Sequence, residues 1–286
     1  MINIPKLLIP AVILAAVFYS GKVGNAQSQH IPQNLSYEAL IDSAENLTHL
    51  NLWSEASELY RQALRINPAS PINSKIFANL GLCLTHTGNY DEALEAYDIA
   101  LVKEPNSASI LSGKGATLLI KGDITSARMI LEEALAVDSL APTALRLHGQ
   151  IMLMENNHQI AESDFSRLTK ADPADAWGHA GIAEVKMARN LYQEAIPLFV
   201  KALQLQESSD FRLSMIAAML KSNHLADAEK AIREALAIYP QQGEFYLLRA
   251  LLHKTLHQNR DMELDKKYAV EYGVDPQIIE RYLNSY

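Results

Sequence analysis

The stretch GLCLTHTGNYDEALEAYDIA, from Gly81 to Ala100, recurs along the chain in altered form. Thirty-four residues later the chain reads GATLLIKGDITSARMILEEA, from Gly115 to Ala134, with small residues at the same places. After the same interval, GQIMLMENNHQIAESDFSRL, from Gly149 to Leu168, keeps most of them. A fixed period of this length indicates an array of repeated structural units.

Seven units fit the period when Gly81 and Ala100 are numbered as positions 8 and 27 of their unit. The units predicted in this way span 37–70, 74–107, 108–141, 142–175, 176–208, 209–242 and 243–274. Positions 8, 20 and 27 hold small residues in nearly every unit, which predicts that two helix backbones come close there. Position 8 reads Ala44, Gly81, Gly115, Gly149, Ala183, Ile216 and Ala250.

Position 15 indicates the backbone conformation of each unit, because it holds Gly or Asn in six of the seven units. These residues accept the left-handed conformation that ends a helix, so each unit is predicted to be helix, sharp turn, helix. Bulky residues at position 24 and Pro at position 32 complete the pattern, since Pro cannot continue a helix. A helix pair cannot bury such a face alone, so the units are expected to stack. The residues at position 15 are Asn51, Gly88, Gly122, Asn156, Asn190, Asn223 and His257.

This pattern resembles the tetratricopeptide repeat (TPR), a 34-residue helical hairpin with small residues at positions 8, 20 and 27, an aromatic at 24 and Pro at 32. The resemblance covers about 240 of the 286 residues. It implies an all-α fold, a right-handed α-solenoid of stacked helical hairpins (the TPR superhelix), closed by a C-terminal capping helix in 275–286. The seventh unit departs most, with Met262, Lys266 and Val274 at positions 20, 24 and 32.

The first 26 residues differ from the rest and are predicted to be a secretory signal peptide. Lys6 precedes the apolar run Leu7 to Tyr19, and Gly24 to Ala26 offers small residues for cleavage before Gln27. The alternative is an uncleaved N-terminal anchor. Residues 27–36 are read as a linker. Cleavage would leave 33 acidic against 23 basic residues, a formal charge of −10, because it removes Lys6 and Lys22.

No motif in the sequence indicates catalysis, a cofactor or a metal. His253 and His257 have the spacing of a zinc pair, but Lys254 replaces the glutamate that a zinc hydrolase needs. His49 and His86 share position 13 of adjacent units and are read as groove histidines. Carboxylates are expected to be spread over solvent faces, with no pair converging in a cleft. The chain is therefore predicted not to be an enzyme.

The resemblance places positions 2, 5, 9, 12 and 13 of each first helix on the inner, concave surface of the superhelix. These positions become apolar in the later units, with a few polar groups among them, as expected of a groove for a protein segment. Part of the pattern is explained equally by packing between hairpins. The predicted groove residues are Arg146, Gln150, Met154, Trp177, Glu184, Met187, Leu213 and Leu220.

The function predicted from this is an exported TPR scaffold, periplasmic or secreted, that binds a protein or peptide segment and helps to assemble or regulate a cell-envelope complex. The alternative is a structural component whose groove is filled by its own oligomer or by Gln27 to Ser36. The family's best-known grip on a C-terminal carboxylate uses Lys, Arg and Asn at inner positions, where units one to three have Ile41, Glu45, Ala78, Leu82, Ser112 and Ala116. The acidic charge disfavours nucleic acid as a partner, and membrane contact is expected only through an uncleaved signal segment.

Overall fold

Fifteen α-helices make up residues 35–284, the part of the chain that this computed structural model describes. The predicted signal segment 1–26 lies outside the described residues. The first helices of the hairpins are α2 (Tyr37–His49), α4 (Asn73–His86), α6 (Ala108–Lys121), α8 (Pro142–Met154), α10 (Ala176–Ala188), α12 (Ser209–Lys221) and α14 (Gly243–Thr255). The second helices are α3 (Trp53–Ile66), α5 (Tyr90–Lys103), α7 (Ile124–Val137), α9 (His158–Ala171), α11 (Tyr192–Leu205), α13 (Leu225–Ile238) and α15 (Asn259–Glu271), and α16 (Pro276–Asn284) follows.

Every turn between the two helices of a hairpin has its position 15 residue in the left-handed region. The angle φ is 59° at Asn51, 81° at Gly88 and 90° at Gly122, and it lies between 57° and 62° at the four other turns. Asn and His tolerate this conformation less readily than Gly, yet the same backbone forms with all three. The predicted helix, turn, helix unit is confirmed at all seven turns.

The small residues of position 8 lie directly under the bulky residues of position 24. A Cβ atom on Gly81 would come within 2.9 Å of the Tyr97 ring, and one on Gly115 within 2.8 Å of Leu131. The position 24 side chains from Tyr60 to Ile232 are all buried. Position 8 is therefore small because the large side chain of the same hairpin occupies the space above it.

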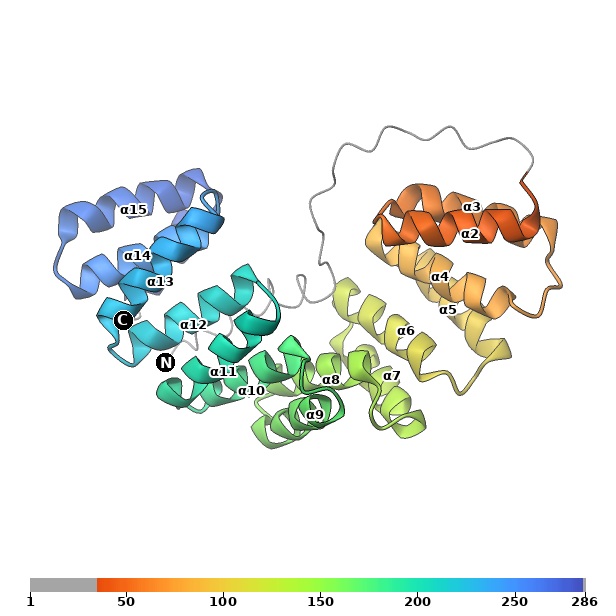
Figure 1. Cartoon of the computed structure of the whole chain (residues 1–286), viewed down its shortest axis with the longest axis horizontal. Helices are drawn as coiled ribbons and strands as arrows, with labels where there is room; N and C mark the ends of the chain where they lie inside the picture. The colour runs from red at the N-terminus through yellow and green to blue at the C-terminus, as the bar shows by residue number, and fades with distance from the viewer. Residues whose placement is uncertain (1–34, 285–286) are drawn as a thin grey trace. The chain divides into compact units, whose positions relative to one another are not determined.

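The hairpins stack in chain order within two compact units, an N-terminal unit (residues 35–151) and a C-terminal unit (residues 152–284). In the N-terminal unit, α3 packs against α4 and α5 against α6; in the C-terminal unit, α9 packs against α10 and α11 against α12. Figure 1 shows the two helices of a hairpin side by side, for example α2 with α3 and α14 with α15. Each unit is an all-α solenoid, with one hydrophobic cluster running from α2 to α5 in the N-terminal unit and another from α10 to α16 in the C-terminal unit.

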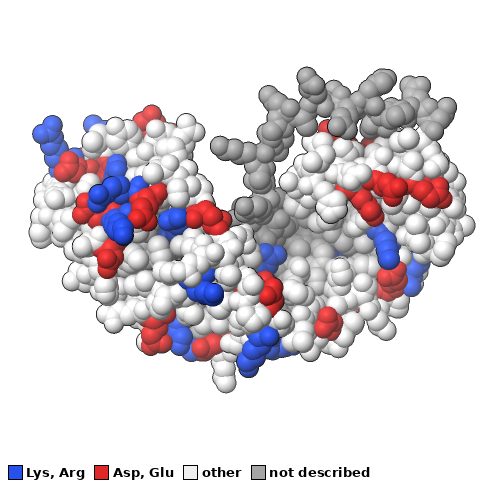
Figure 2. All heavy atoms as spheres, viewed as in Figure 1, with Lys and Arg blue, Asp and Glu red and all other residues white. Residues whose placement is uncertain are grey.

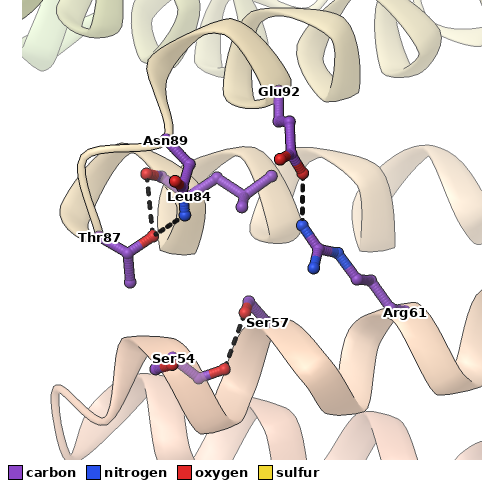
Figure 3. A network of polar contacts seen from close by, with 7 residues as sticks. All are labelled: Ser54, Ser57, Arg61, Leu84, Thr87, Asn89 and Glu92. Atoms are coloured by element: carbon purple, nitrogen blue, oxygen red, sulfur yellow. Dashed lines mark hydrogen bonds and ion pairs between the residues drawn. The ribbon is translucent and has the colours of Figure 1, made fainter.

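Polar contacts at the hairpin surface also link neighbouring hairpins. Arg61 on α3 and Glu92 on α5 form an ion pair of 2.5 Å between neighbouring hairpins (Figure 3). At the α4–α5 turn, the Asn89 amide donates to the Thr87 hydroxyl at 3.1 Å, and that hydroxyl donates to the Leu84 carbonyl at 3.1 Å. Exposed pairs of this kind contribute at most about 1 kcal/mol, so apolar packing dominates the stack.

The last hairpin explains how the chain tolerates the departures in its seventh unit. Lys266, at the position that is bulky and buried elsewhere, forms ion pairs with Glu263 at 3.1 Å and with Glu280 of α16 at 2.5 Å. Helix α16 covers the end of the stack through Ile279, Tyr282 and Leu283, which are buried. Asp275 accepts a hydrogen bond from the backbone N–H of Gln277 at 2.7 Å and so helps to start this helix.

Among residues 35–284, no helix is both long and apolar enough to cross a bilayer. The single cysteine, Cys83, is fully buried in α4. Burial raises the pKa of its thiol to about 11. Its sulfur lies 3.7 Å from the Thr48 hydroxyl.

A thiol reagent is expected to modify Cys83 at least about a hundred times more slowly in the folded chain than in urea, because both access and the thiolate form are suppressed. Spectrophotometric titration with a chromogenic disulfide measures both rates. Equal rates would mean that α4 opens readily around Cys83.

Candidate functional site

The N-terminal unit contains a hollow of about 480 Å³ on the face formed by its first helices, here called the N-terminal hollow. It lies across α4, α6 and the beginning of α8, so three successive hairpins contribute to it. Seven of its 17 lining residues come from positions 2, 5 and 9, which the sequence pattern assigns to the inner face. These are Ala78, Leu82, Ser109, Ser112, Ala116, Thr143 and Arg146.

Small side chains keep the N-terminal hollow open. Ala78, Ser112 and Ala116 line it, and Gly113 lies beside them on α6 with the Tyr97 ring packed against it. The short side chains of Ala78, Ser112 and Ala116 leave room for a side chain from outside. Leu82 keeps 37% of its surface exposed in the hollow, which gives it an apolar wall.

Polar groups stand at the rim of the N-terminal hollow. The His86 ring stacks on Trp53 with centroids 3.9 Å apart, and burial lowers the pKa of His86, which favours the neutral ring. Asn79, Asp138 and Arg146 also contribute to the lining. An apolar floor with a few polar groups suits a protein segment with hydrophobic anchors.

The C-terminal unit contains a smaller pocket of about 210 Å³, here called the C-terminal pocket. It lies between α12, α14 and the segment that leads into α16. Its walls are apolar apart from the carboxylates of Glu244 and Asp275 and the Tyr282 ring. The aliphatic side chains that line it are Leu213, Leu247, Leu248, Val274 and Ile278.

Three carboxylates follow one another across α10, α12 and α14 and are called the acidic row: Glu184, Asp210 and Glu244. Burial and the nearby charge of Asp210 raise the pKa of Glu184 to about 7, although the Ser214 hydroxyl donates to it. Burial and the charge of Glu244 raise the pKa of Asp210 to about 6. The expectation that carboxylates are spread apart on solvent faces was wrong for these three, because the stacking of first helices brings their inner positions together.

On the face drawn in Figure 2, acidic and basic side chains are interspersed. His253 pairs with the buried carboxylate of Asp265 at 2.9 Å, and Arg249 donates to the same carboxylate at 2.6 and 2.9 Å. His257 lies in the left-handed turn. Across residues 35–284, no three His, Cys, Asp or Glu side chains are grouped so as to hold a metal ion.

Comparison with known families agrees with this architecture. A family model described as tetratricopeptide repeat matches residues 39–109 and 113–176, and a second model of the same description matches residues 186–252. Together they cover well over half of the chain. The chain belongs to the tetratricopeptide repeat family.

Individual relatives share the TPR fold at low sequence identity. The mitochondrial import receptor subunit TOM70 of Saccharomyces cerevisiae is 25% identical over 204 residues, 68% of this chain and 28% of TOM70. The chain thus spans little more than a quarter of the length of this curated relative. A TPR protein from Parabacteroides merdae has a similar structure, with a TM-score of 0.67 and 22% identity over 87% of this chain and 97% of its own. PilW, a type IV pilus biogenesis factor, has a TM-score of 0.64 and 20% identity over 74% of this chain and 98% of its own.

The groove residues predicted from the TPR pattern lie in different environments. Arg146 lines the N-terminal hollow, and Leu213 lines the C-terminal pocket. Glu184 belongs to the acidic row. Met187 and Leu220 are buried in the core of the C-terminal unit and offer little surface to a partner. The Trp177 ring packs edge-on against Phe211 of the next hairpin, with centroids 4.9 Å apart.

Gln150 and Met154 are half-buried on α8 and line neither the N-terminal hollow nor the C-terminal pocket. Apart from Arg146 and Leu213, sequence reasoning missed the residues that line the two cavities. Small side chains at the inner positions of α4 and α6 signal the first cavity. Nothing in the repeat pattern signals the second, because the segment that leads into α16 forms part of it.

Proposed function

We propose that this TPR scaffold binds an extended or helical segment of a partner protein in the N-terminal hollow. The observation that carries the proposal is the hollow itself, about 480 Å³ of open space at inner positions of α4, α6 and α8. A stack that needed its first helices only for packing would gain by filling this space, since close packing stabilises protein interiors. The hollow instead presents Leu82, Ser109 and Arg146 around an open floor.

The proposed setting is the cell envelope, where the scaffold would help to assemble or regulate a complex. The signal-like pattern in residues 1–26 supports this, with Lys6, the apolar run and the small residues before Gln27. The fold shared with PilW is in keeping with such a role. The lack of a catalytic motif is in keeping with a binding protein rather than an enzyme.

Filling the hollow is expected to abolish partner capture without unfolding the chain. Ala116 on α6 is half-buried and lines the hollow, so Ala116→Trp places a large ring in the open space. Met129→Trp is the matched control, because Met129 on α7 is 61% exposed and lies outside the hollow. The measurement is capture of proteins from the envelope fraction by each immobilised variant, followed by mass spectrometry.

The proposal holds if the unchanged chain and Met129→Trp retain the same partner while Ala116→Trp loses it and melts within a few degrees of both. Equal capture by all three would show that the partner binds elsewhere. Sedimentation of the unchanged chain at several concentrations tests the competing structural role. If the apparent mass of the unchanged chain rises with concentration and that of Ala116→Trp does not, a second copy of the chain fills the hollow.

A further inference from the structure

The acidic row in the C-terminal unit is not paired with basic side chains in the described part of the chain. No ion pair joins Glu184, Asp210 or Glu244 to a basic side chain among residues 35–284. Each is half-buried, and the Ser214 hydroxyl donates a hydrogen bond to the Glu184 carboxylate. Holding unpaired carboxylates close together in a partly desolvated site is unfavourable, so a row of them is more often functional than structural.

The C-terminal pocket adjoins this row, because Glu244 belongs to both. Leu213, Leu247 and Ile278 give the pocket apolar walls, and its volume of about 210 Å³ suits one aliphatic or aromatic side chain. An apolar pocket beside a row of negative charges selects a binding partner for two properties. A partner must offer an apolar anchor for the pocket and positive charge for the row.

We propose that the C-terminal unit binds a basic, apolar segment of a partner protein, with an apolar side chain in the C-terminal pocket and Lys or Arg side chains along the acidic row. The inference rests on the proposed function, since it extends segment binding from the N-terminal hollow to a second place with defined chemistry. Arg side chains suit the row well, because the guanidinium donates in a fork that matches a carboxylate.

Charges on the neighbouring helices leave the row negative. The negative charge of Asp210 raises the pKa of Glu184, and the negative charge of Glu244 raises the pKa of Asp210. Lys221 lies at the opposite end of α12 from Asp210, about 16 Å along the helix axis. Six other basic side chains of this unit form ion pairs with carboxylates outside the row, as Lys186–Glu194, Arg189–Glu162, Arg212–Glu207, Arg233–Glu229, Arg249–Asp265 and Lys266–Glu280.

This environment also gives the binding a pH dependence. Glu184 and Asp210, with pKa values of about 7 and about 6, are largely protonated at pH 5 and ionised at pH 8. A cationic segment binds the ionised form, so its affinity is expected to rise over this interval. Binding between these two pKa values should release protons, which isothermal titration in buffers of different ionisation enthalpy detects.

The test is selection of random peptides displayed on phage against the full chain at pH 8. Selected peptides are then synthesised, and their affinities are measured for three proteins. The first is the unchanged chain, and the second carries Glu184→Gln, Asp210→Asn and Glu244→Gln, which keep side-chain shape. The third is the matched control with Asp227→Asn, Glu234→Gln and Glu271→Gln, which removes three exposed carboxylates from α13 and α15. Ile278→Trp fills the pocket as an independent variant.

The inference predicts that the selected peptides carry Lys or Arg close to Leu, Ile or Phe. The row variant, which carries the three substitutions in the acidic row, and Ile278→Trp should each bind these peptides at least about tenfold more weakly than the unchanged chain. The control should bind them as tightly as the unchanged chain. Peptides without basic residues, or peptides bound equally by the row variant, would overturn it. If those peptides lose binding to Ala116→Trp instead, segment binding in the N-terminal hollow stands and only the acidic row is excluded. Failure to select any peptide would overturn both proposals.

Discussion

Replacing Ala127 with phenylalanine is expected to lower the free energy of unfolding by about 3 kcal/mol, the upper part of the range for overpacking a core. Ala127 is fully buried on α7, and its carbonyl lies 3.6 Å from where a Cβ on Gly115 would be. A phenyl ring there must push α6 and α7 apart. In a stack where each hairpin contacts only its neighbours, the damage is expected to spread to the adjoining hairpins first.

Met129→Phe is the matched control, because Met129 is on the same helix and 61% exposed. Urea denaturation followed by circular dichroism gives the midpoint of each variant. The control is expected to unfold at the midpoint of the unchanged chain. Coincident midpoints for Ala127→Phe and Met129→Phe would mean that the phase assigned to the repeats is wrong.

Replacing Glu184 with glutamine is expected to stabilise the chain at pH 8 by about 2 kcal/mol. Folding raises the pKa of this carboxyl from 4.5 to about 7, and each unit of difference corresponds to about 1.4 kcal/mol. Part of the side chain still contacts water, which reduces the full value. Glutamine keeps an oxygen that accepts from the Ser214 hydroxyl but carries no charge.

The direction of this effect follows from the pH at which the carboxyl ionises in the folded and in the unfolded chain. Below pH 4.5 the carboxyl is protonated in both states and the substitution should have little effect. As pH rises towards 7 the unfolded chain ionises first, so the unchanged chain loses stability that the glutamine variant keeps. Denaturation midpoints of both chains from pH 4 to pH 8 measure the divergence, and parallel curves would contradict it. Asp227→Asn, an exposed substitution on α13, serves as the control.

The hairpins could be predicted from sequence because their determinants are local and repeated. Position 15 must take a left-handed conformation, and every turn from Asn51 to His257 does so. Position 8 must be small because a position 24 side chain covers it, as Tyr97 covers Gly81. Seven copies of such constraints reinforce one another, even where Asn or His replaces Gly.

The candidate sites were harder to predict because they depend on what neighbouring hairpins leave unfilled. Inner positions with apolar residues were expected to form a groove, yet Met187 and Leu220 are buried in the core, where the next hairpin covers them. The hollow forms instead where the inner residues are small, at Ala78, Ser112 and Ala116. The acidic row joins three hairpins, so no single repeat reveals it.

The most direct test of the central claim, that the inner face of the N-terminal unit holds a protein segment, is photo-crosslinking from inside the hollow. A photoreactive phenylalanine analogue is placed at Ser109, which is exposed and lines the hollow, and at Met129 on the outer face as the control. After irradiation in cells, mass spectrometry identifies the crosslinked peptides. The account predicts crosslinks from Ser109 to one segment of one partner, and none to that segment from Met129. Crosslinks to the same segment from both positions, or none from Ser109 while the partner is still captured, would contradict it.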